Sequence, residues 1–301
     1  MTLSFLHRGS HNHASFRYRA WRIAEALRAS INDYTADLLV FAKPWPSNLE
    51  EMRIAKANGQ RVIVDSCDAH WYKPEVKQMM VEADALTVNT PYMAKLVFEV
   101  FGRTSYLIHD PYEYEEVEPH CSGNHLLWYG HPNNADSFNR IARFMQQYPF
   151  AIVTNQSAII GTPSIEVIEW SHDVMLQQFA IADIVLMPET APYKSANRTI
   201  EAVRQGCFVV AEPHQSLMDI PGIWIGNIKE GVAWAIANPA EARQRTRQAQ
   251  LYVAEKYSLA HAVNAWKTLL KAFSCILDQE ENIGTAGSMS MPSEEKVSLM
   301  S

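Results

Sequence analysis

The segment PYKSANRTIEAVRQGCFVVAEP, residues 192–213, joins a charged helical stretch directly to an apolar, strand-like run. Ser195 is expected to cap the start of the helix, and Gly206 stands where a glycine commonly ends one. The run CFVVA, 207–211, combines aromatic and β-branched residues and follows without a loop. The segment therefore predicts a helix that leads into a buried strand, which is the repeating unit of parallel α/β sheets.

Short apolar runs alternate with helical segments along most of the chain. The runs with strand character lie at 2–6, 37–41, 61–65, 85–88 and 105–109, and then at 125–129, 150–154, 166–170, 183–187, 207–211 and 222–226. They are apolar enough to be covered by helices on both faces. The sequence therefore predicts an α/β protein with two Rossmann-like, doubly wound parallel sheets, the first of five strands and the second of six.

The boundary between the two sheets is expected in residues 110–124, DPYEYEEVEPHCSGN, which contain four glutamates and show neither a helical nor a strand period. We therefore expect an N-terminal Rossmann-like domain at 1–118 and a C-terminal one at 119–258. A final helix at 259–278 is expected to pack back on the first domain. Residues 279–301 lack aromatic side chains and are expected to form a disordered tail.

Composition excludes several classes of function. The chain has 301 residues, 48% of them apolar and 20% charged, and a formal net charge of -7, which argues against wholesale binding of a polyanion. No apolar run is long enough to span a bilayer and no signal peptide is visible, so we expect a cytoplasmic protein. The four cysteines form no C-x-x-C pair, and Walker A, G-x-S-x-G and G-x-G-x-x-G motifs are absent.

Ligands of open parallel sheets bind beyond the carboxyl ends of the strands, so the loops at those ends are the first candidates for a site. Two domains placed face to face would bring their loops to one cleft. The loops concerned are 7–15, 66–74 and 110–114 in the first domain, and 130–137 and 188–198 in the second.

The helix within 192–206 begins with the side chains that an anion site needs. Its first-turn amides have no partners within the helix, and Lys194 and Arg198 add formal positive charge at the same end. Glu201 lies one turn beyond Asn197 on the same face, where a carboxylate can accept hydrogen bonds from two ribose hydroxyls. An ordinary surface helix with an Arg198–Glu201 pair explains the same residues, and the residues alone leave both interpretations open.

Acid and base candidates follow the third expected strand. Asp68 and His70 share one loop that faces the expected cleft, and we predict them as the catalytic pair. His109 and Asp110 end the fifth strand and are weaker candidates. Asp65 and Asp68 have only weak metal spacing, so we expect no metal site.

The segment KSANRTIEAVRQGCFVVA, 194–211, resembles the donor-nucleotide motif of GT-B glycosyltransferases, particularly the retaining, group 1-like members. LLWYGHPNNADSF, 126–138, is similar to the opening of the C-terminal domain of that family, and ASFRYRAWRIAEAL, 14–27, resembles its first N-terminal helix. The resemblance covers about residues 1–275. It implies two Rossmann-like domains that face a cleft in the GT-B architecture.

The resemblance also implies a function. We expect a metal-independent, retaining glycosyltransferase that moves a hexosyl or pentosyl group from a nucleotide-diphosphate sugar, used as a co-substrate without further cofactors. The acceptor, which the N-terminal domain would hold, is left open among a polysaccharide, a lipid carrier, a small molecule and a nucleic acid. Ser10 and Arg17 are expected to contact phosphate or acceptor. The expected donor-binding residues are Gly130, Asn133, Lys194, Asn197, Arg198 and Glu201.

Two departures from the family pattern keep other functions open. Tyr193 stands eight positions before Glu201, where many members have an acidic residue that reaches the transferred sugar. The loop GHPNNADS, 130–137, lacks the arginine and lysine that many members direct at the diphosphate. The alternatives are a nucleotide-sugar epimerase of the same architecture and a non-catalytic nucleotide-sugar-binding protein.

Overall fold

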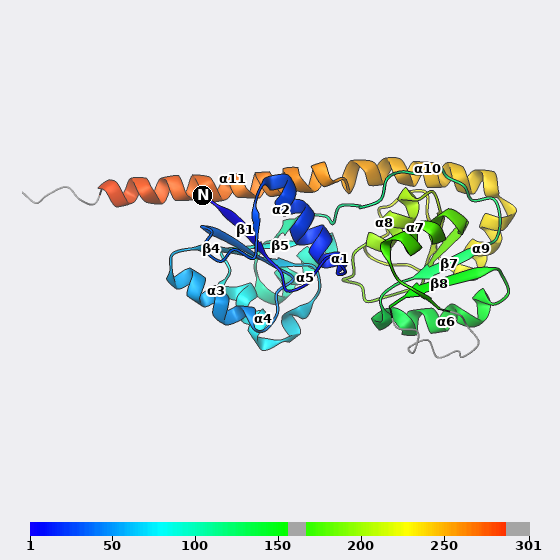
Figure 1. The fold of residues 1–301 in the computed structure, drawn as a ribbon, viewed down its shortest axis with the longest axis horizontal. Helices are drawn as coiled ribbons and strands as arrows, with labels where there is room; N and C mark the ends of the chain where they lie inside the picture. Colours follow the sequence, from blue (N-terminus) through cyan, green and yellow to red (C-terminus); the bar gives the residue numbers. More distant parts are fainter. Residues whose placement is uncertain (156–166, 287–301) are drawn as a thin grey trace, which may run out of the picture.

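The protein contains two parallel β-sheets of six strands each, and helices cover both faces of each sheet (Figure 1). The computed structural model describes residues 1–155 and 167–286, without the side chains of residues 133, 135 and 274–286. The expected strand at 166–170 lies partly outside this range, and the structure places β9 at Ile168–Glu169. The predicted fold class is confirmed.

The first sheet has the strand order β2-β1-β3-β4-β5-β6. Its strands are β1 (Leu3–Leu6), β2 (Ser30–Ile31), β3 (Leu38–Ala42), β4 (Arg61–Ser66), β5 (Ala85–Val88) and β6 (Tyr106–Leu107). The expectation of five strands was wrong, because β2 is a two-residue edge strand and leaves no apolar run in the sequence. The order reverses between β1 and β3, which makes this pair the topological switch point of the sheet.

The helices of the first domain pack on both faces of the sheet. They are α1 (Ala14–Phe16), α2 (Arg22–Leu27), α3 (Asn48–Ala57), α4 (Pro74–Glu82) and α5 (Pro91–Phe101). Alternate residues of β3 enter the two cores, with Leu38 and Val40 on the side of α2, and Leu39 and Phe41 on the side of α3 and α4. This alternation is what buries every residue of the strand.

The second sheet has the order β12-β11-β10-β7-β8-β9, with its switch point between β7 and β10. Its other strands are β7 (Leu126–Tyr129), β8 (Phe150–Thr154), β10 (Ile184–Met187), β11 (Phe208–Ala211) and β12 (Trp224–Ile225). The helices are α6 (Ala135–Met145), α7 (His172–Ile181), α8 (Asn197–Arg204), α9 (Ile228–Ala237) and α10 (Pro239–Lys256).

The last helix, α11 (Leu259–Ala286), returns to the first domain. Figure 1 shows α10 along the second domain and α11 continuing along the first. Trp266 is buried against Phe5 of β1, with the ring centroids 5.1 Å apart in an edge-to-face arrangement. The helix runs to Ala286, past the start of the tail expected at 279, and residues 287–301 lie outside the described range. Within the described residues, no helix has both the length and the apolar character to cross a bilayer.

The first helical segment is interrupted by a π-helical turn, Arg17–Trp21, between α1 and α2. In this turn the guanidinium of Arg19 is buried between two carboxylates. Its Nε donates to Asp65 Oδ2 at 2.9 Å and its Nη1 to Asp110 Oδ1 at 3.1 Å. Burial acts to lower the pKa of Arg19. The charges of Asp65 and Asp110 outweigh this effect, so the pKa lies above its ordinary value. Asp65 is fully buried in this network, so it is not accessible to a ligand.

Replacement of Arg19 by Met should destabilise the protein strongly, because it leaves Asp65 and Asp110 buried without a counter-charge. We expect a loss of about 3 to 5 kcal/mol in the free energy of unfolding measured by urea denaturation. The matched control is Arg53→Met, which removes a solvent-exposed pair with Glu82 and should change stability little. Equal losses in the two variants would show that the buried network has no special role.

Candidate active site

An ion pair connects the carboxyl edges of the two sheets. Lys194 lies in the loop between β10 and α8, and its Nζ is 2.6 Å from Oδ1 of Asp68 in the loop after β4. The two loops belong to different domains and are 126 positions apart in the chain. Two loops at the carboxyl ends of strands, one from each sheet, therefore meet across the domain interface, as the sequence predicts.

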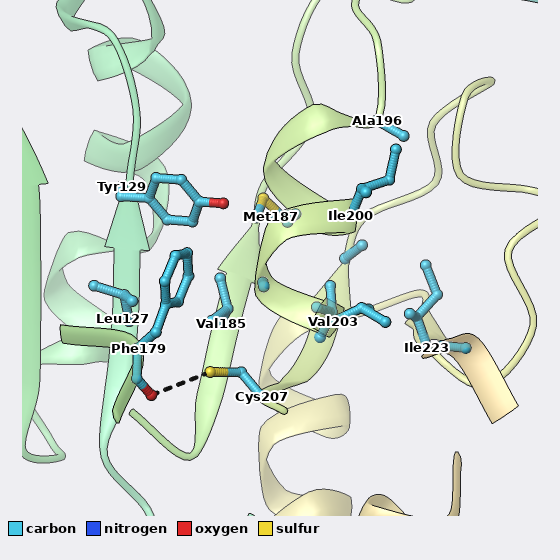
Figure 2. Close-up of a cluster of buried hydrophobic side chains, with 14 of the residues drawn as sticks. Leu127, Tyr129, Phe179, Val185, Met187, Ala196, Ile200, Val203, Cys207 and Ile223 are labelled. Atoms are coloured by element: carbon cyan, nitrogen blue, oxygen red, sulfur yellow. Dashed lines mark hydrogen bonds between the residues drawn. The ribbon is translucent and has the colours of Figure 1, made fainter. Parts of the chain in front are cut away.

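Helix α8 is held in place by its buried face (Figure 2). Ile200 and Val203 pack in the core that contains Val185 of β10 and Leu127 of β7. Below the helix, Cys207 Sγ donates a hydrogen bond of 3.5 Å to the carbonyl oxygen of Phe179. The start of α8 is thus fixed by packing on the strands that form the switch point.

The two ends of α8 agree only in part with the sequence. Gly206 has a left-handed φ of 78°, and the amides of Gly206 and Cys207 bond back to Val203 and Ala202, so the expected C-terminal glycine is confirmed. The expected cap at Ser195 was wrong. Ala196 is the residue that precedes the first turn, and no side chain caps it. The amides at this end consequently have no side-chain acceptor from the capping position.

Arg198 places a partly buried cation beside the backbone of the loop after β7. Its Nη1 donates to the carbonyl oxygen of Tyr129 at 2.9 Å, and Tyr129 Oη donates to the carbonyl oxygen of Arg198. A Cβ atom on Gly130 would lie 3.0 Å from the same nitrogen, so the glycine leaves the guanidinium room. Burial lowers the pKa of Arg198, and no carboxylate of the described residues pairs with it. A desolvated cation without a counter-ion is suited to an anionic ligand.

Asp68 is the centre of the charged cluster at the interface. Its Oδ2 lies 3.2 Å from Lys43 Nζ and 3.9 Å from His70 Nε2, while its Oδ1 holds Lys194. Burial acts to raise the pKa of Asp68, but Lys194 and Lys43 hold it below its ordinary value. Burial lowers the pKa of His70, against the opposing effect of Asp68. The structure therefore brings the predicted catalytic pair together, with a carboxylate and a neutral imidazole near pH 7.

Three histidines lie in the loops that follow the switch-point strands β1 and β7. His7 and His13 come from the loop after β1, and His131 comes from the loop after β7. Burial, followed by the charges of Lys43 and His13, lowers the pKa of His7 to about 4. Burial and the charges of Lys43 and Lys194 also lower the pKa of His131. Lys43 of the first domain and Lys194 of the second therefore supply the positive charge where the two switch points face each other, while His7 and His131 are neutral near pH 7.

Glu201 is buried beneath the linker between the domains, and 4% of it is exposed. Its Oε1 accepts hydrogen bonds from Tyr18 Oη at 3.1 Å and from the amide of Glu113 at 2.8 Å, and its Oε2 accepts from the amide of Tyr114 at 3.2 Å. Burial raises the pKa of Glu201 to about 7, although these hydrogen bonds oppose the shift. About one lone pair of the carboxylate is left for a ribose hydroxyl, so the predicted ribose contact stays a prediction.

The two residues expected to contact phosphate or acceptor lie on the N-terminal side of the interface. Arg17 Nε pairs with Glu113 Oε1 at 2.7 Å, and its Nη1 donates to the carbonyl oxygen of His11 at 2.6 Å. Ser10 is exposed, and its amide donates to Nδ1 of His13 at 3.2 Å. Arg17 is thus engaged by the linker, whereas Ser10 remains accessible beside the histidines.

The other expected donor-binding residues have different positions. Asn197 lines a small interdomain cavity of about 60 Å³ together with Asn89 and His109. The Oδ1 atom of Asn89 is buried there and has no hydrogen-bond partner among residues 1–155 and 167–286. Asn133 belongs to the 3₁₀ turn Pro132–Asn134, and its side chain lies outside the described part of the chain.

The residues that sequence reasoning missed are Lys43, His13, His131 and Tyr18. Lys43 directly follows β3, and its position at the switch point could have identified it once the strand order was known. Tyr18 reaches Glu201 only because of the π-helical turn, for which the sequence gives no signal.

The Glu201 environment predicts a pH dependence of stability. Because folding raises the pKa of this carboxyl from 4.5 to about 7, the native state binds more protons than the unfolded state between these values, and stability decreases as pH rises through them. Glu201→Gln removes the titration. The free energy of unfolding of the variant minus that of the wild type should therefore increase from pH 5 to pH 8, by at most about 3 kcal/mol. A difference that is constant with pH in urea denaturation would mean that Glu201 titrates normally.

Comparison with solved structures shows which fold this is. The chain is similar to Anabaena Alr3699/HepE in complex with UDP and glucose, with a TM-score of 0.69 at 11% identity over 91% of this chain and 99% of that one. It is also similar to WaaG, a glycosyltransferase involved in lipopolysaccharide biosynthesis, with a TM-score of 0.56 at 11% identity over 87% of this chain and 98% of that one. The chain has the GT-B fold.

A protein of Listeria monocytogenes assigned as a UDP-N-acetylglucosamine 2-epimerase has a TM-score of 0.54 at 11% identity, over 92% of this chain and 97% of that one. The fold therefore includes more than one chemistry. Neither a family model nor a curated protein sequence matches the chain.

Proposed function

We propose that the protein is a glycosyltransferase that moves a sugar from a nucleotide-diphosphate donor to an acceptor held by the N-terminal domain. The observation that carries this proposal is the Arg198 guanidinium beside Gly130, at the switch point between β7 and β10, which pairs with no carboxylate of the described residues. The start of α8 adds its amides and Lys194 adds a second cation. The complexes of HepE with UDP and with UDP-glucose support a nucleotide-sugar donor.

In this proposal the diphosphate lies between Arg198 and Lys194, and the nucleoside extends along α8 toward Glu201. As the bond between the sugar and the diphosphate breaks, the fixed cations stabilise the charge that develops on the leaving group. We propose that the reaction is metal-independent because these side chains supply positive charge at that place. We propose a retaining outcome because segment 194–211 resembles the group 1-like members.

Asp68 and His70 act on the acceptor in this proposal. The acceptor hydroxyl donates a hydrogen bond to one of them, and its oxygen forms the new bond to the sugar on the face that the diphosphate leaves, as retention requires. The proton passes to the imidazole of His70. The lowered pKa of His70 leaves the ring neutral near pH 7, so it has a lone pair that can take this proton. The bond between the sugar and the diphosphate is thereby replaced by a bond between the sugar and the acceptor oxygen.

A thermal-shift panel of UDP, GDP, ADP and CDP tests the donor site. One diphosphate at about 100 times its dissociation constant should stabilise the wild type by about 2.7 kcal/mol, which raises the melting temperature by several degrees. Arg198→Met should lose most of this shift, because the variant keeps the packing of the side-chain stem and removes the charge. The control Arg53→Met should respond as the wild type does. No shift with any of the four diphosphates would refute the donor assignment.

The likeness to the assigned epimerase supports a second candidate, an enzyme that converts the donor sugar without an acceptor. The binding diphosphate identifies the donor base, and nucleotide sugars of that base can then be incubated with the protein alone. Formation of an epimer, detected by NMR, would favour the epimerase. Release of diphosphate only when a carbohydrate or lipid-linked acceptor is added would favour the transferase.

A further inference from the structure

The Asp68 carboxylate is held between lysines of the two domains. Lys194 contacts Oδ1 at 2.6 Å from the C-terminal side, and Lys43 contacts Oδ2 at 3.2 Å from the N-terminal side. The exposed fractions of the side chains are 14% for Asp68, 24% for Lys43 and 42% for Lys194. An anion therefore already occupies the space between the two cations, and the protein itself supplies this anion.

Lys43 is built into this position by its backbone. It directly follows β3 at the switch point of the first sheet, with a left-handed φ of 55°, and its amide donates to the carbonyl oxygen of Asp65 at 2.9 Å. This conformation is uncommon for residues other than glycine, and such strain is concentrated at functional sites. Burial lowers the pKa of His131 in the loop after β7 of the other domain, and the charge of Lys43 adds to this shift.

The C-terminal domain alone provides few cations for a diphosphate. Its loop after β7, GHPNNADS at 130–137, contains neither arginine nor lysine. Arg198 and Lys194 are the two cations that the α8 end supplies, and Lys194 is occupied by Asp68. A diphosphate carries more than one negative charge. A third cation from the opposite domain would supply the positive charge that the loop after β7 lacks.

We propose that Lys43 is a donor-binding residue, and that the diphosphate replaces Asp68 between Lys43 and Lys194. The inference rests on the proposed function, because it assigns the phosphate contacts of that same donor site. Asp68 pairs with both lysines before the donor binds, so the diphosphate must compete with Asp68 for them. Once released, its carboxylate is free to accept the hydrogen bond of the acceptor hydroxyl, so the acceptor site is completed after the donor has bound.

The two possible roles of Asp68 predict opposite effects on binding. If Asp68 only fixes the lysines in place, Asp68→Asn leaves them disordered and weakens diphosphate binding. If Asp68 competes with phosphate, the neutral amide of Asp68→Asn removes the competitor and tightens binding. The sign of the change therefore separates a structural ion pair from an exchange.

Isothermal titration calorimetry with UDP, GDP, ADP and CDP, each paired with its nucleoside, measures these effects. For the diphosphate that binds the wild type, we expect Lys43→Met to weaken binding roughly 10-fold or more, as for the loss of one charged hydrogen bond. Nucleoside binding should be unchanged in this variant. Asp68→Asn should tighten diphosphate binding several-fold, and adding Lys43→Met to it should remove most of the gain.

Lys73→Met is the matched control. Lys73 lies in the same loop as Asp68, with its ammonium 4.7 Å from the centre of the Trp45 ring, and the structure shows no ion pair between it and Asp68 among the described residues. Its loss should leave diphosphate binding unchanged.

If the wild type binds no diphosphate, the proposed function is wrong. If the wild type binds and Lys43→Met binds equally well, or Asp68→Asn fails to tighten binding, the exchange is wrong and the donor site can still stand.

Discussion

The burial of one guanidinium, that of Arg19, fixes the positions from which the Asp68 loop and the interdomain linker leave the first domain. Its contacts with Asp65 and Asp110 join the first helical segment, the end of β4 and the start of the interdomain linker. Charges taken out of water hold each other tightly, because any displacement leaves one of them uncompensated. The loop that carries Asp68 begins at the end of β4, and the linker begins at Asp110, so both leave the first domain from fixed positions.

The linker carries this constraint to the donor helix. The amides of Glu113 and Tyr114 bond to Glu201, and the carbonyl oxygen of Glu118 lies so close to Gly206 that a Cβ there would meet it at 2.4 Å. Tyr18 adds a hydrogen bond to Glu201 from the π-helical turn that also carries Arg19. The Glu201 carboxylate of α8 thus contacts the first domain and the linker. In our proposal it also contacts the donor nucleoside. A ligand that reaches Glu201 must share it with these groups, which couples donor binding to the packing of the domains.

The sequence predicts the architecture well because apolar runs and helix ends are local signals. The runs at 85–88 and 150–154 coincide with β5 and β8, and Gly206 ends α8 as expected. Pairings between distant residues leave no such signal. The contact of Lys194 with Asp68 spans 126 positions, and it depends on strand order and domain orientation. The role that we propose for Lys43 likewise depends on the position of β3 beside β1.

The central claim is that a nucleotide diphosphate binds where the switch points of the two sheets face each other. A crystal structure of the protein with the nucleoside diphosphate that binds most tightly tests this claim most directly. We predict that the phosphates lie within hydrogen-bond distance, about 3 Å, of Arg198 and Lys194, with Lys194 withdrawn from Asp68. Phosphates bound elsewhere, with the Lys194–Asp68 pair intact and Arg198 without an anion, would contradict the account.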